Sequence, residues 1–177
     1  GGDAIVNAAA AAQAVFTSGT PATRPAAVVL APVDDWRVGL AASVLMGPPL
    51  RAPLLYTEGD ELPQATKDAL ATLKPRGSRE LRRTQVIRVA TNASTDLKTR
   101  DIKGTDPAAI ARSIDAFAGA ARQRTSDRVL IVSSEDPAFA MPAAAWAAKA
   151  GDPILFSGRD AAPEDTVRAL QAHQRPK

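Results

Sequence analysis

Apolar residues occur along the chain in short runs that end at polar turns, and these runs alternate with longer stretches of helical character. Ala27–Ala31 and Val129–Ser133 are two such runs, and Pro53–Thr57 and Pro153–Ser157 are two more. Short, continuously apolar runs are typical of strands that are buried on both faces of a sheet. The order strand–helix–strand–helix predicts parallel strands joined by right-handed crossovers.

Six helices are predicted between and beside these strands. Several begin with proline, which suits the first helical turn because its missing N–H is not needed there. Alanine accounts for 38 of the 177 residues, and its small side chain lets a helix lie close to a sheet. We therefore expect a three-layer α/β fold, an open and mostly parallel sheet with alanine-rich helices on both faces. The predicted helices are Asp3–Phe16, Trp36–Gly47, Pro63–Leu73, Pro107–Ala121, Ala138–Ala150 and Pro163–Ala172.

The two halves of the chain repeat the same order of residues. Asp35 and Asp136 are 101 residues apart, and the prolines that open the second strands and third helices recur at a spacing of 100. The sequence predicts two tandem repeats, residues 1–83 and residues 84–177, the second truncated at its C-terminal end. Thr84–Ala90 alternates well enough to be a third strand, and residues 91–95 are expected to form a loop. A counterpart of that strand is expected to be cut off or missing after Gln174.

Composition excludes several classes of chemistry. The chain has no cysteine, which excludes disulfides, thiolate metal sites and thiol nucleophiles. Its single histidine, His173, argues against serine–histidine catalysis and against multi-histidine metal sites. No apolar stretch approaches the roughly 20 residues that a membrane-spanning helix needs. The sequence predicts a non-catalytic protein without cofactor, metal or membrane span.

Both halves resemble the bacterial cell wall-binding repeat type 2 family. Asp34–Ala42 (DDWRVGLAA) fits the family's E-D-F-P-D-A-L-A-A stretch, and Ala147–Ser157 (AAKAGDPILFS) fits its A-K-x-x-x-P-I-L-L-T stretch. The resemblance implies an extracellular module that anchors a surface protein to the cell wall of a Gram-positive bacterium. The family usually has three repeats around a pseudo-threefold axis, so the resemblance also implies self-association or packing with a missing third repeat.

The chain departs from the family pattern at several positions. The second aspartate of the central stretch is replaced by Val38 in the first half and by Phe139 in the second. The Arg-Tyr pair expected after Asp3 and Asp106 is absent from both halves. An alternative function is therefore a small-molecule or protein-interaction domain on the same fold that has lost wall binding.

The segment Lys74–Lys103 is strongly basic, with nine basic and three acidic residues and a net charge of +6. Such a cluster suits an anionic polymer, and the family resemblance favours an anionic cell-wall glycopolymer. The segment contains no aromatic residue for base stacking, which argues against nucleic acid. A solvated loop without a specific partner is the alternative. The candidate polyanion-binding residues are Arg76, Arg79, Arg82, Arg83, Arg88 and Arg100.

Acidic pairs follow the first strand of each half, Asp34-Asp35 and Glu135-Asp136. The carboxyl ends of parallel strands often form ligand sites, so Asp35 and Asp136 could bind a ligand. The same residues suit N-caps, because a carboxylate accepts hydrogen bonds from the free N–H groups of a helix. Trp36 and Trp146 could stack on sugar rings or anchor the core.

Overall fold

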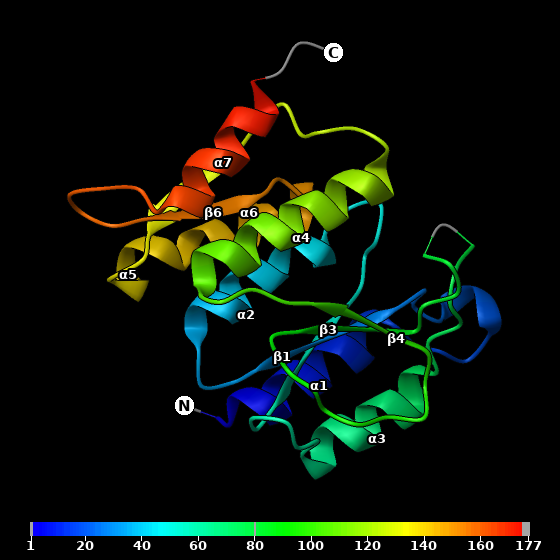
Figure 1. Cartoon of the computed structure of the whole chain (residues 1–177). Helices are drawn as coiled ribbons and strands as arrows, with labels where there is room; N and C mark the ends of the chain where they lie inside the picture. Colours follow the sequence, from blue (N-terminus) through cyan, green and yellow to red (C-terminus); the bar gives the residue numbers. More distant parts are fainter. Residues whose placement is uncertain (1, 80, 175–177) are drawn as a thin grey trace.

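Four parallel strands form the first sheet, in the order β2-β1-β3-β4 (Figure 1). The computed structural model describes residues 2–79 and 81–174. β3 lies within the predicted third strand, whereas β4 was not predicted. β3 and β4 pair in the same sheet as β1 and β2. The predicted division of the chain at residues 83/84 falls just before β3, and it remains a prediction. The strands are β1 (Val28–Pro32), β2 (Leu54–Thr57), β3 (Val86–Val89) and β4 (Thr99–Ile102).

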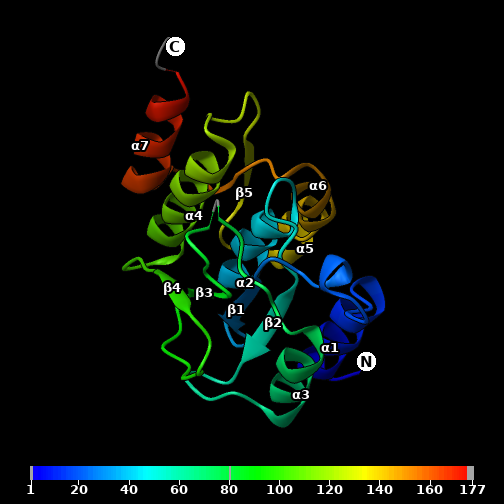
Figure 2. The same ribbon diagram turned by 90° about the vertical axis from the view of Figure 1, so that its right-hand side faces the viewer.

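Helices cover both faces of this sheet, and the predicted α/β fold with parallel strands is confirmed (Figures 1 and 2). Val28 and Leu30 lie in an apolar cluster with residues of α1 and α3. Val29 and Ala31 lie in a second cluster with residues of α2 and α4. Successive side chains of a strand point to opposite faces, which separates the two clusters. These helices are α1 (Ala4–Val15), α2 (Trp36–Ala42), α3 (Gln64–Leu73) and α4 (Pro107–Arg122).

The second half repeats this arrangement around a separate sheet of two parallel strands. α4 packs on α7 and on β6, as α1 packs on α3 and on β2. Val29 pairs with Leu54 in the first sheet and Leu130 with Ile154 in the second, which matches the spacings of 101 and 100 residues in the sequence. The strands thus form two sheets instead of one. The elements are β5 (Leu130–Ser133), α5 (Pro137–Ala140), α6 (Pro142–Ala150), β6 (Ile154–Ser157) and α7 (Glu164–His173).

The second helix of each half is shorter than predicted. In the first half, α2 continues as a 3₁₀ helix, η2 (Ser43–Met46). In the second half, the predicted helix is divided at Met141–Pro142 into α5 and α6. Pro142 has no N–H to donate to a carbonyl of the preceding turn, and its ring obstructs that turn. A further 3₁₀ turn, η1 (Pro21–Thr23), precedes β1.

The last helix, α7, is attached to α4 by polar side chains. Arg112 Nε lies 2.7 Å from Asp165 Oδ1. The histidine Nε2 of His173 lies 2.7 Å from Asp115 Oδ2, and its Nδ1 lies 2.9 Å from the carbonyl oxygen of Ser126. The one histidine of the chain therefore lies between α7, α4 and the loop before β5.

The two halves meet where α2 packs on α4 and η2 packs on α6. Trp36 contacts Phe156 edge-on at 6.3 Å between ring centroids, and Arg37 Nε donates to the Ser134 carbonyl at 2.5 Å. At the η2–α6 contact the two backbones approach so closely that a Cβ on Gly47 would lie 2.4 Å from Gly151 Cα. Only glycine fits this contact without displacing backbone.

Replacing Gly47 by alanine should separate the two halves locally and lower the free energy of unfolding by about 1–3 kcal/mol, as overpacking does in other cores. Urea denaturation followed by circular dichroism measures this loss. Gly19→Ala is the matched control, because a Cβ at Gly19 meets no atom within 4 Å. Equal stability of the two variants would contradict the close contact.

Candidate functional site

Basic residues stand just before the strands of the first sheet. In a parallel sheet the amino ends of all strands lie at one edge, so residues far apart in the sequence gather there. The loop after α3 lies at this edge too, because Arg76 N donates to Pro25 O at 3.1 Å and Gly77 N to Ala26 O at 2.8 Å. We call this region the amino edge. The residues before the four strands include Arg24, Arg51, Arg82, Arg83 and Lys98.

A groove of about 760 Å³ lies at the amino edge, between the end of α3 and the loop that joins β3 to β4. We call it the basic groove. Its walls combine the aliphatic side chains of Leu62, Leu70 and Leu97 with cationic groups, against the single carboxylate of Asp96. Such a groove can take a ligand that carries negative charge on an apolar body, as a sugar phosphate does. Its cations are Arg24, Lys67, Lys74 and Arg76.

These cations are available to a ligand. Lys67, Lys74 and Arg76 are exposed, and no described carboxylate forms an ion pair with them. Arg24 is half-buried, and its Nε is buried without a hydrogen-bond partner among the described residues. Unpaired buried donors are uncommon in folded proteins, which makes Arg24 notable.

The loop between α3 and β3 carries four of the predicted polyanion-binding residues, and all four are exposed: Arg76, which lines the groove, and Arg79, Arg82 and Arg83. Arg82 and Arg83 have positive φ angles of 51° and 63°. Their backbone is held in this conformation because Arg83 N donates to Ser78 O at 2.7 Å and Lys98 Nζ donates to Arg82 O at 2.8 Å. The loop thus presents its guanidinium groups from an anchored backbone.

Arg88 and Arg100 already have partners within the protein. Arg88 Nε and Nη2 donate to the two carboxylate oxygens of Asp101 at 2.6 and 3.0 Å, and Nη1 donates to Ala93 O at 3.1 Å. The hydrogen bond and charge of Arg88 lower the pKa of the Asp101 carboxyl. The Arg100 guanidinium lies over the Phe117 ring, 4.8 Å from its centroid. The structure therefore separates these two residues from the basic groove.

Sequence reasoning missed Arg24 and Lys67, which line the basic groove from outside the basic segment. Lys67 lies on α3, which ends at the amino edge because it runs antiparallel to the strands. The recurrence of a basic residue just before each strand could have indicated Arg24, whereas no pattern in the sequence indicates Lys67.

The acidic residues at the carboxyl ends of the strands have the geometry of helix N-caps. Asp35 Oδ1 accepts from Arg37 N at 2.9 Å, and Asp136 Oδ1 accepts from Ala138 N at 2.8 Å. Asp35 also lines an acidic cleft with Asp106, Glu135, Glu164 and Asp165. Among residues 2–79 and 81–174, no group of three or more acidic or histidine side chains is placed to hold a metal ion.

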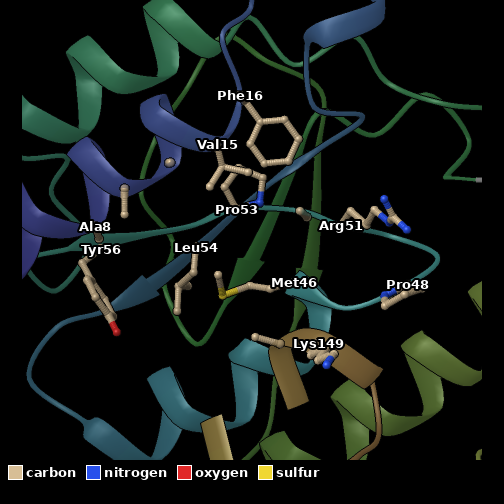
Figure 3. Close-up of a pocket in the computed structure, with 14 residues that line it drawn as sticks. Ala8, Val15, Phe16, Met46, Pro48, Arg51, Pro53, Leu54, Tyr56 and Lys149 are labelled. Atoms are coloured by element: carbon tan, nitrogen blue, oxygen red, sulfur yellow. The ribbon is translucent and has the colours of Figure 1, made fainter. Parts of the chain in front are cut away.

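A second, mostly apolar pocket of about 640 Å³ lies between α1, the segment before β2 and the end of α6 (Figure 3). Phe16 and Val15 lie above it, and Tyr56 lies at one end. Arg51 and Lys149 are both exposed at its rim. The pocket is large enough for a small molecule.

The two tryptophans differ in exposure. Trp36 packs against the core beside Phe156. Trp146 is 47% exposed, and its indole N–H donates to Asp152 Oδ2 at 2.8 Å. Trp146 is therefore the more exposed of the two, and the Arg128 guanidinium lies 5.9 Å from its ring centroid. In the part of the chain that the structure describes, no helix is long and apolar enough to cross a membrane.

Comparisons with known proteins establish the fold of this module. No protein-family model matches the chain, and no curated protein matches its sequence. Among solved structures, Cwp6 from Clostridium difficile matches 98% of the chain with a TM-score of 0.78 and 18% identity. Cwp8 from the same organism matches 96% of the chain with a TM-score of 0.69 and 20% identity. The chain covers only 27% and 28% of those two chains, so it shares its fold with one part of each.

Replacing Arg88 by leucine should lower stability by about 1 kcal/mol without weakening anion binding, because its guanidinium joins β3 to β4. The pKa of Asp101 is lowered by folding. The contribution of the pair is therefore complete above the ordinary carboxyl pKa and is lost as the pH falls through the lowered one. Denaturation at neutral pH and below about pH 4 should show the difference from wild type closing in acid.

Arg159→Leu is the control for this experiment, since Arg159 is exposed, has no described ion pair and lies outside the basic groove. A variant at Arg88 that keeps full stability and loses anion binding would assign Arg88 to the ligand instead.

Proposed function

We propose that this chain is a non-catalytic module of a bacterial surface protein that binds an anionic glycopolymer of the cell wall. The observation that carries the proposal is the basic groove together with the exposed arginines of the adjoining loop. The fold shared with the cell wall proteins Cwp6 and Cwp8 supports the setting of the cell wall. The sequence resemblance to the cell wall-binding repeats supports the same class of ligand.

The arrangement suits a repeating polymer better than a single small anion. The groove and the loop together present seven cationic side chains, Arg24, Lys67, Lys74, Arg76, Arg79, Arg82 and Arg83. Exposed ion pairs each contribute only about 0.2–1 kcal/mol, so one contact cannot hold the module. Successive anionic units of a polymer engage several cations at once, and the linked contacts raise the total affinity. The leucines of the groove can contact the carbon faces of sugar rings.

This proposal places the protein outside the cell, on the wall of a Gram-positive bacterium. The module would also associate with a second copy of itself or pack with a third repeat.

Triple replacement Lys67→Gln, Lys74→Gln and Arg76→Gln should weaken binding to purified Gram-positive cell walls about tenfold, because three ion pairs are lost. Co-sedimentation with walls at rising salt measures the effect. Wild-type binding should fall with salt, and the triple variant should show a shallower dependence. Walls stripped of their anionic polymer should retain neither protein.

The matched control, Arg124→Gln, Arg159→Gln and Arg168→Gln, removes the same charge from exposed positions outside the groove. It should bind walls as wild type does. Equal binding by the groove variant and wild type, or retention that ignores salt, would contradict the charge-based mechanism.

The apolar pocket favours a second candidate function, the binding of a small molecule. Ala11 is exposed and lines this pocket, but not the basic groove. Ala11→Trp should therefore fill the pocket and leave the groove intact. If wall binding survives Ala11→Trp and fails in the groove variant, the polymer binds at the amino edge. The opposite result would assign the ligand to the pocket.

A further inference from the structure

The two walls of the basic groove continue into loops that lie far apart in the sequence. One wall runs from the end of α3 into residues 74–76, where the cations Lys74 and Arg76 flank Pro75. The other wall is residues 94–97, at the end of the loop that joins β3 to β4. Both of these stretches lie outside helices and strands, so secondary structure alone does not fix their separation.

Gln85, the residue directly before β3, is hydrogen-bonded to both walls. Its side-chain Nε2 donates to Pro75 O at 2.7 Å, between the two cations of the first wall. Its Oε1 accepts from Lys98 N at 3.2 Å, directly after the second wall. Gln85 is half-buried and lines the groove. One side chain therefore joins the cationic wall to the wall that faces it.

The backbone of Gln85 is fixed as well. Gln85 N donates to Lys98 O at 2.8 Å, and Gln85 O accepts from Val28 N at 2.9 Å, where β1 begins. Its backbone and side chain thus connect β1, the start of β4 and the loop after α3. Because both ends of its amide are engaged within the protein, Gln85 acts on a ligand through the position of the walls.

We propose that Gln85 is the positioning residue of the basic groove, and that it holds the cationic wall at a fixed separation from the wall of Leu97 before the polymer binds. This role rests on the proposed function, because it requires the anionic glycopolymer to bind in this groove. Loops that are already ordered lose less conformational entropy on binding, so a preformed groove binds more tightly than the same cations on free loops. The contribution of Gln85 is independent of charge, since its side chain is neutral.

The test is Gln85→Met, which keeps the length of the side chain and removes both of its hydrogen bonds. Binding to purified Gram-positive cell walls should weaken about three- to tenfold, because binding must then order the two loops. The dependence of binding on salt should stay that of wild type, since no cation is lost. Hydrogen exchange of the Lys98 and Arg76 amides should become about fivefold faster or more, with that of Val29 in β1 unchanged.

Two variants control for other effects of the substitution, and both should bind walls as wild type does. Gln64→Met removes one side-chain hydrogen bond, to Asp68 on α3, outside the groove. Arg88→Leu should destabilise the fold without weakening anion binding, so it separates a general loss of stability from a loss of position. Gln85→Asn provides a second test, because its side chain is one methylene too short to reach both walls and should show the same loss as Gln85→Met.

Wild-type affinity of Gln85→Met despite faster exchange would overturn the positioning role. Weaker binding without faster exchange, or an equal loss of binding in Arg88→Leu, would overturn it too. The two proposals fail separately. If the triple variant of the groove cations binds less tightly than wild type while Gln85→Met binds normally, only the positioning role is wrong. If the triple variant binds as wild type does, the groove is not the polymer site and both proposals are wrong.

Discussion

Complete burial of β1 is the constraint on which the rest of the first half depends. Its backbone needs a strand on each side, and its side chains need a helix layer on each face. β2 and β3 supply the first requirement, and α1 and α3 with α2 and α4 supply the second. The alanines of these helices allow the helices to lie close to the sheet. Four of them are buried: Ala9, Ala12, Ala41 and Ala42. Helix α4 serves both halves, because it packs on α2 and β4 as well as on β6 and α7.

The positions of the charged residues follow from the same topology. A parallel sheet places every residue that precedes a strand at one edge, and every residue that follows a strand at the other. In the first half, basic residues such as Arg51 and Arg83 predominate in the first set, and acidic residues such as Asp35 and Glu58 in the second. Helices that return between the strands begin at the acidic edge and end at the basic one, so both sets of charges also complement the helix dipoles. Ligand sites in open α/β folds are usually sought at the carboxyl ends, where this molecule is acidic.

The sequence was sufficient for features that depend on local pattern. Short apolar runs identified β1, β2, β5 and β6, and prolines marked the starts of helices. Prediction from the sequence failed for features that are determined by residues far apart in the chain. β4 (TRDI) was missed because only Ile102 is buried, so no apolar run indicates a strand. Pro142 interrupts a helix that alanine content alone had extended, and the division into two sheets depends on which edges find partners.

The candidate site was predictable only in part for the same reason. Arg88 and Arg100 lie within the basic segment, but strand register places Arg88 beside Asp101, and packing places Arg100 over Phe117. Arg24 and Lys67 join the groove through the order of strands, which no local window contains.

The separation of charge along the strands also gives the first half an electric dipole. An object with a dipole rotates in a field before it touches the surface that produces the field, and such steering speeds association with the correct orientation. Near a densely anionic surface the molecule would turn its amino edge inward and the carboxyl ends of β1 and β2 outward.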